Sequence, residues 1–158
     1  IFGTGFRATE FLSPLRITGT DGADLFQTWG EGASAFLGIG VPGFPNLFML
    51  YGPNTNLGHN SILFMIEQQA RWIRSLLVDM QRNGIAAAEV TPAAMRRYEA
   101  EIDEALTRTV WAEDCHSWYK TDSGRVTNNW PDYTVRYRRR LRRRQDGDLS
   151  LVPAPATR

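Results

Sequence analysis

The sequence predicts an α/β fold, and three consecutive segments near its middle support this prediction. The apolar run 46–51 lies between Pro45 and Gly52 and is typical of a short strand that is buried on both faces. A polar loop, residues 52–61, follows it. From about Ser61 to Arg82 the apolar residues recur three or four positions apart, which is typical of an amphipathic helix. Ligands of open α/β sheets bind at the carboxyl ends of the strands, so we expect a ligand at this loop.

The composition is that of one soluble globular domain, with 158 residues of which 42% are hydrophobic and 22% are charged. The chain opens at Ile1 directly on a Gly-rich segment that resembles the second half of a strand, so we expect a piece of a longer polypeptide. The basic start of a signal peptide and the ~18 apolar residues of a membrane span are both missing. The single cysteine, Cys115, excludes an internal disulfide and suits a reducing compartment. We therefore expect a cytoplasmic protein without a membrane span.

The segment before the predicted strand is rich in glycine, which favours turns and short strands over helix. Within it, residues 3–8 (GTGFRA) match the dinucleotide fingerprint G-x-G-x-x-G/A, in which missing side chains let the backbone approach a pyrophosphate. Pro14 would cut short the helix that should follow this fingerprint. The residues alone therefore leave two alternatives open, a cofactor contact or a plain turn between a strand and a loop.

The loop 52–61 combines two Gly, one Pro, three Asn, a Thr, a His and a Ser. Free amides at the start of the following helix, at the positive end of its dipole, would stabilise negative charge on a bound group. The alternative is a polar loop that only caps its own helix, through Asn60 or Ser61. His59 has no partner at metal-ligand spacing, so we expect no metal site. No nucleophile motif such as G-x-S-x-G is present, which argues against a hydrolase.

A second helix is expected to begin at Thr91-Pro92, with the threonine as cap, proline in the first turn and an apolar stripe from Met95 to Leu106. An irregular region rich in aromatic residues follows it, with Trp111, Trp118, Tyr119 and Trp130. These rings could cover a nucleotide or an apolar substrate, or they could fill a gap between the second helix and the sheet.

The run 136–144 (RYRRRLRRR) holds seven of the 18 basic residues, and the rest of the chain has 11 basic against 17 acidic residues. An acidic body with one basic end is a poor match to a dedicated nucleic-acid-binding domain. Only Tyr137 and Leu141 are available to pack, which predicts a solvated helical end. The last ten or so residues, with Pro153 and Pro155, are expected to be a frayed tail.

Several of these segments together resemble a known family. The runs FGTGFRATEFL (2–12) and VPGFPNLFMLYGPNTNLGHNSILFMIEQQ (41–69), together with Trp111, CHSWY (115–119) and TNNWP (127–131), resemble the C-terminal part of class B flavoprotein monooxygenases, most closely the Baeyer–Villiger type. The resemblance implies the C-terminal part of the FAD-binding Rossmann-like domain of a flavoprotein with two dinucleotide-binding domains. Residues 1–140 would belong to that domain, with a mobile NADP and substrate loop near 112–131, and 141–158 would form a disordered tail.

The resemblance also implies where cofactors bind. The crossing from the NADP domain to the FAD domain would use Gly3 and Gly5. The second FAD-contacting segment would use Pro53, Asn54, Thr55, Asn60, Ser61 and Ile62, with amides near Ile62 facing the flavin ring. The loop that closes over NADP and the substrate would use Trp118 and Tyr119.

The function implied by the resemblance is insertion of one oxygen atom from O2 into a ketone to give an ester or lactone, with FAD and NADPH as cofactors. The arginine that stabilises the peroxyflavin in this family is expected upstream of Ile1, so no catalytic residue is assigned within the chain. The expected partners are the ketone, O2 and the rest of the same polypeptide, and the isolated piece should be inactive. The alternatives are an N- or S-hydroxylating flavin monooxygenase and a non-catalytic module that binds polyanions through 136–144.

Overall fold

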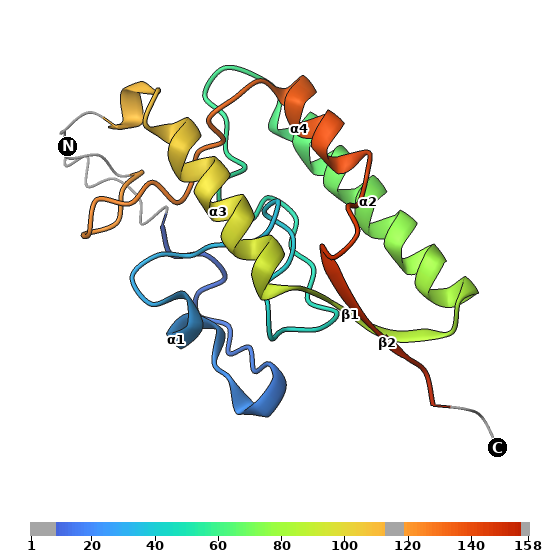
Figure 1. Cartoon of the computed structure of the whole chain (residues 1–158). Coiled ribbons are helices and arrows are strands. Elements are labelled where there is room, and N and C mark those ends of the chain that lie inside the picture. The colour runs from blue at the N-terminus through green and yellow to red at the C-terminus, as the bar shows by residue number, and fades with distance from the viewer. Residues whose placement is uncertain (1–8, 113–118, 156–158) are drawn as a thin grey trace.

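The computed structural model describes residues 9–112 and 119–155. The predicted site residues Gly3, Gly5 and Trp118 lie outside these ranges. The elements in chain order are η1 (Thr20–Gly22), α1 (Leu25–Trp29), α2 (Ile62–Arg82), β1 (Ile85–Val90), α3 (Pro92–Leu106), η2 (Val110–Ala112), α4 (Thr134–Leu141) and β2 (Leu149–Pro153). Figure 1 shows α2 and α3 as the two long helices, with α4 lying beside α2. Within the described ranges, no helix is both long enough and apolar enough to cross a bilayer.

The expected long helix is confirmed as α2. Its first turn is capped by Ser61, whose Oγ accepts a hydrogen bond from the Phe64 N–H at 3.2 Å. It ends at Arg82, and Gly84 then turns the chain with a positive φ of 62°. One face of the helix is buried in the core, through Met65, Gln68, Gln69, Trp72, Leu76 and Met80.

The second expected helix is confirmed as α3. The Oγ1 atom of Thr91 accepts a hydrogen bond from the Ala94 N–H at 3.2 Å, and Pro92 occupies the first turn. Its buried stripe consists of Ala94, Met95, Tyr98, Ile102 and Leu106. Local capping and apolar spacing therefore predict both long helices correctly.

The predicted strand at 46–51 is wrong. Asn46 and Tyr51 have positive φ angles of 60° and 57°, which an extended strand cannot contain. The segment is instead an irregular connection that Asn46 attaches to β1. The Asn46 side chain accepts from the Ala88 N–H at 3.0 Å and donates to the Ala86 carbonyl at 3.0 Å.

The expectation of a disordered tail is also wrong for the residues that form β2. This strand pairs antiparallel with β1, with Val90 opposite Leu149 and Ala88 opposite Leu151. Within the described ranges the sheet has these two strands alone. The α/β class is therefore observed, but the sheet is formed by an antiparallel ribbon beside the helices.

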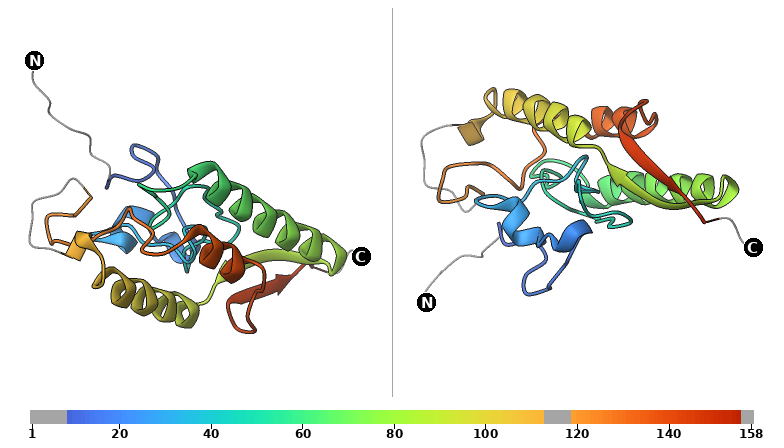
Figure 2. Two further views of the ribbon diagram at one scale, coloured as in Figure 1. Left: turned by 90° about the horizontal axis from the view of Figure 1, so that it is seen from above. Right: turned by 60° about the horizontal axis from the view of Figure 1, so that its bottom comes forward.

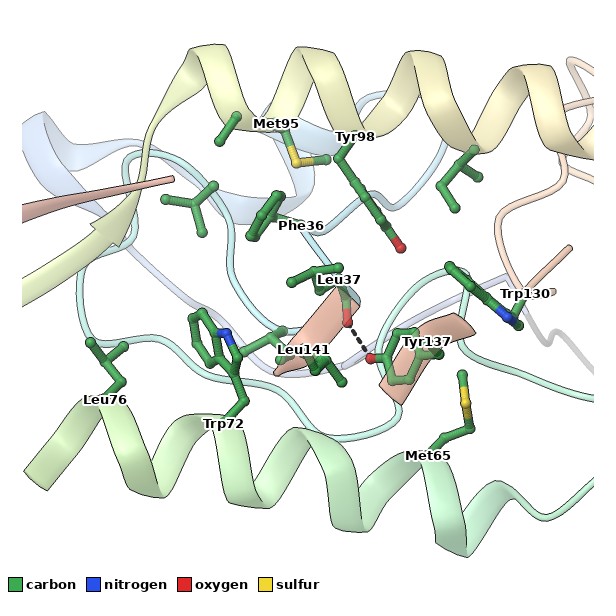
Figure 3. Close-up of a cluster of buried hydrophobic side chains, with 14 of the residues drawn as sticks. Phe36, Leu37, Met65, Trp72, Leu76, Met95, Tyr98, Trp130, Tyr137 and Leu141 are labelled. Carbon is green, nitrogen blue, oxygen red and sulfur yellow. Dashed lines mark hydrogen bonds between the residues drawn. The ribbon is translucent and has the colours of Figure 1, made fainter. Parts of the chain in front are cut away.

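The main core lies between α2, α3 and α4, as Figure 3 shows. Tyr137 of α4 is fully buried there, and its hydroxyl donates to the Leu37 carbonyl at 2.6 Å. A second cluster, which includes Leu25, Trp29 and Phe44, holds the N-terminal segments together. In the right-hand view of Figure 2 these blue segments lie on the opposite side of the molecule from α4. The loop 52–61 enters α2 at the edge of the main core, so the core positions this loop.

Candidate functional site

The loop 52–61 is held in place by the segment 126–130, which lies more than 70 residues later in the chain. The Asn54 N–H donates to the Thr127 carbonyl at 2.7 Å, and the Asn56 N–H donates to the Asn128 carbonyl at 2.9 Å. In return, the Trp130 N–H donates to the Asn56 carbonyl at 2.9 Å. These bonds form a short parallel bridge that fixes the backbone of the loop.

The side chains at the start of the loop bind the protein itself. Asn54 has a positive φ of 57°, and its side-chain amide donates to the carbonyls of Val126 at 3.0 Å and Asn129 at 3.2 Å. Thr55 is fully buried and donates from Oγ1 to the Gly52 carbonyl at 2.7 Å. Pro53 is buried as well. Of the predicted site residues, these three therefore stabilise the conformation of the loop.

Two glycines allow the loop to approach the neighbouring segment 35–41. A Cβ atom on Gly52 would overlap the Gly38 carbonyl oxygen, and a Cβ atom on Gly38 would overlap the Thr55 Cγ2 atom. Gln69 of α2 links the same two segments. Its Oε1 accepts from the Tyr51 N–H at 2.9 Å, and its Nε2 donates to the Leu37 carbonyl at 3.3 Å. Sequence reasoning missed Gln69, although an amide on the apolar face of α2 was a usable signal.

The end of the loop is exposed to solvent and caps α2. Asn60 Oδ1 accepts from the Ser61 N–H at 2.7 Å, and Ser61 in turn caps Phe64. The structural alternative for this loop, self-capping, is therefore observed. No described residue accepts a hydrogen bond from the N–H groups of Ile62 and Leu63, which point out of the first turn of α2. Capping thus leaves two amides available to a ligand at the positive end of the helix.

A cavity of about 320 Å³ lies beside the loop. Its lining residues combine apolar and polar side chains and are Phe11, Tyr51, Gly52, Asn56, Leu57, Tyr119 and Asn128. The side-chain oxygen Oδ1 of Asn128 is buried and has no hydrogen-bond partner in the described part of the chain. Burial, with a further contribution from nearby Tyr119, raises the pKa of the Tyr51 hydroxyl above its ordinary value. The cavity therefore combines apolar surface with polar side chains, and one of its lining residues, Asn128, has a buried side-chain oxygen without a partner among the described residues.

A larger cavity of about 990 Å³ lies between the N-terminal segment and the turn at 120–124. It shares Phe11 with the smaller cavity, and its other lining residues include Glu10, Glu31, Lys120 and Asp122. None of its described lining residues has a buried polar side-chain atom without a hydrogen-bond partner. The smaller cavity is therefore the better candidate for a specific ligand.

The aromatic residues after α3 serve mainly as packing where they are described. The Trp130 ring meets the Tyr137 ring edge-on, with centroids 5.0 Å apart, and Trp111 packs against the main core. Both residues therefore fill space in the core, but Trp130 does so against α4, where the expectation placed the gap between the second helix and the sheet. Tyr119 is the one member of the predicted NADP and substrate pair that the structure describes, and it lines the smaller cavity.

No metal site is found among the described residues, and His59 is exposed on the loop. Burial raises the pKa values of the Tyr98 and Tyr137 hydroxyls well above the ordinary value, because the charged forms would lose their hydration. Both tyrosines are therefore neutral core residues.

The chain matches no family model, but it is similar to several known proteins. It is 41% identical over 156 residues to the FAD-binding monooxygenase ktnD of Aspergillus niger, covering 96% of this chain and 26% of that protein. It is 40% identical over 157 residues to a Baeyer–Villiger monooxygenase of Pseudomonas aeruginosa, covering 98% of this chain and 30% of that protein. The chain thus spans about a quarter to a third of the length of these relatives.

Solved structures show the same fold. The structure superposes on an oxidised steroid monooxygenase bound to NADP with a TM-score of 0.75 and 26% identity, over 89% of this chain and 27% of that one. It superposes on OTEMO in complex with FAD and NADP with a TM-score of 0.72 and 29% identity, over 86% of this chain and 26% of that one.

Proposed function

Because this chain belongs to the class B flavoprotein monooxygenases of the Baeyer–Villiger type, we propose that it is the flavin-positioning part of an enzyme that uses FAD, NADPH and O2 to convert ketones into esters or lactones. The observation that carries this proposal is the loop 52–61 itself, which borders a cavity of mixed apolar and polar lining and ends at two free amides of α2. The chain spans 26% to 31% of its first relatives, so the activity is proposed for the complete polypeptide.

The residues of this cavity fit the ring system of a flavin. Phe11 and Leu57 offer apolar surface to a flat ring, and Tyr51, Asn56 and Asn128 add polar side chains to the same lining. When bound, FAD would supply the chemistry that transfers electrons from NADPH to O2.

The role proposed for the loop is to hold the ring and to stabilise charge on it. Asn54 and Thr55 keep the backbone in one shape through the hydrogen bonds described above, and Pro53 is buried beside them. Asn60 and Ser61 set the start of α2, so that the amides of Ile62 and Leu63 can donate to an electron-rich edge. The helix dipole favours the electron-rich form of such a group without any rearrangement.

We propose further that residues 1–140 belong to the FAD-binding domain, with Gly3 and Gly5 at the crossing from the NADP domain. Trp118 and Tyr119 would belong to the loop near 112–131 that covers NADP and the substrate. The position of Tyr119 on the cavity supports this assignment, because it brings one end of that loop to the proposed flavin site.

The test is an assay of the complete polypeptide that contains this chain. Purified enzyme is supplied with NADPH, O2 and either cyclic and aryl ketones or amines and sulfides, and the products are identified by gas chromatography with mass spectrometry. Esters or lactones are expected from the ketones. Hydroxylamines or sulfoxides without any ester would instead assign a hetero-atom hydroxylase, and no flavin in the purified protein would contradict the proposal altogether. The 158-residue chain alone should not turn over.

A further inference from the structure

The arginine run 136–144 is the sequence motif that the proposed monooxygenase does not use. In the structure its side chains separate into columns four residues apart around α4. Tyr137 and Leu141 are buried in the core. Arg136 and Arg140 turn to the α3 side, where they pair with Asp132 at 2.9 Å and Asp148 at 3.7 Å. The expected packing of Tyr137 and Leu141 is therefore confirmed, and the arginines around them differ in their partners.

A third column, Arg138 and Arg142, borders a groove between α2 and α4. We name it the basic groove and define it by Gln68, Arg71, Trp72, Ser75, Arg138, Leu141, Arg142 and Arg144. Its volume is about 490 Å³. Figure 1 shows α2 and α4 side by side. Four arginines from two helices and the following turn thus surround one concavity, and none of its lining residues is acidic.

The charges in the basic groove are only partly neutralised. Arg71 pairs with Glu67 at 3.5 Å in an exposed contact, and Arg144 pairs with Asp79. Across the described residues, the side chains of Arg138 and Arg142 have no ion-pair partner, and Nη1 of Arg144 is buried without an acceptor. The guanidinium groups of Arg138 and Arg142 are therefore the unpaired positive charges that an anion in the groove can neutralise.

We propose that the basic groove binds the phosphate groups of a small phosphorylated ligand, at a site separate from the flavin loop. Guanidinium groups bind phosphate oxygens in pairs of parallel hydrogen bonds, which gives arginine an advantage over a simple point charge. Trp72 and Leu141 add a partly apolar floor that could hold the uncharged part of such a ligand. A nucleic acid or a membrane would instead draw on the exposed Arg139 and Arg143 outside the groove, which the control variant below removes.

Isothermal titration calorimetry with inorganic pyrophosphate tests this proposal on the complete polypeptide at physiological salt. FAD and NADP⁺ are kept saturating, so that their own phosphate sites are filled. The double variant Arg138→Gln/Arg142→Gln removes the two unpaired arginines of the groove. The matched control Arg139→Gln/Arg143→Gln removes the same charge from two exposed arginines of the same run that do not line the groove. Circular dichroism establishes that both variants are folded.

The groove variant should weaken pyrophosphate binding by roughly tenfold or more, because each lost contact is a charge-assisted hydrogen bond, while the control changes it less than about twofold. Equal weakening in both variants would overturn the proposal, since it would mean non-specific attraction to the run. Absence of pyrophosphate binding to the unmodified protein would overturn it too. Binding of duplex DNA or of phosphatidylserine vesicles that pyrophosphate cannot displace would assign the run to a macromolecular partner instead.

Discussion

Gly38 is the position where a single added methyl group tests how the flavin loop is held. Its φ is +65°, and a Cβ atom there would overlap Thr55 Cγ2 and lie 3.0 Å from the Pro53 carbonyl oxygen. In Gly38→Ala the left-handed backbone costs about 1–2 kcal/mol. Overpacking against the buried Thr55 adds about 1–3 kcal/mol. We therefore expect the free energy of unfolding to fall by about 2–5 kcal/mol.

The structure offers a matched control for this substitution. Gly84 also has a left-handed backbone, with φ of +62°, but nothing lies within 4 Å of its missing side chain. Gly84→Ala should therefore cost only the backbone share, about 1–2 kcal/mol. Adding Thr55→Ser to Gly38→Ala removes the overlapping methyl and keeps the hydroxyl that bonds Gly52, so it should restore part of the loss.

Urea denaturation followed by tryptophan fluorescence gives the free energy of unfolding of Gly38→Ala, of Gly84→Ala and of the double variant Gly38→Ala/Thr55→Ser. In the complete polypeptide, FAD affinity should fall in Gly38→Ala and remain unchanged in Gly84→Ala, because only the first displaces the loop 52–61. Equal destabilisation by the two alanines, or no recovery in the Thr55→Ser background, would refute the view that the loop is held by close packing between Gly38 and Thr55.

Three further predictions concern the core that supports the loop. Tyr137→Phe leaves the buried Leu37 carbonyl without its 2.6 Å hydrogen bond and should cost about 1–2 kcal/mol in urea denaturation; an unchanged midpoint would contradict that bond. Burial raises the pKa values of Tyr98 and Tyr137 above the ordinary 10.0. Their contribution to stability is therefore present below pH 10. It is lost as the pH rises above 10, because the unfolded chain then releases protons that the folded chain retains. The urea midpoint of unfolding should therefore fall between about pH 10 and 11 in the unmodified chain and fall less in Tyr98→Phe. An equal fall of the midpoint in both proteins would argue against burial as the cause. Asp148→Ala removes a carboxylate that is 2% exposed and lies 2.6 Å from Arg97, and it should cost about 3 kcal/mol; an exposed pair, tested as Glu104→Ala next to Arg108, should change stability by less than about 1 kcal/mol.

The features that could be predicted from the sequence are those governed by neighbouring residues. Ser61 and Thr91 cap α2 and α3 through bonds to amides three residues away, and the apolar spacing of each helix marks its buried face. Such contacts form within one turn of helix, so they are legible in a short stretch of sequence. The polar loop before α2 could be located for the same reason.

The remainder depended on contacts between distant segments. The run 46–51 has the composition of a strand, but positive φ angles at Asn46 and Tyr51 and the bonds of Asn46 to β1 make it a bent connection. The last residues look like a tail until they meet β1, about 60 positions earlier, and form β2.

The candidate site shows the same division. Its polar loop and helix start were determined by the sequence alone, through the capping residues and the helical spacing. Only the tertiary structure decided that the segment 126–130 clamps the loop, that Gln69 joins it to Leu37, and that the arginine run separates into paired, buried and groove-lining columns. The physical reason is that these contacts, apart from the i,i+4 pair of Arg136 and Asp132, join residues with no fixed spacing. They form only when the core between α2, α3 and α4 has brought the segments together.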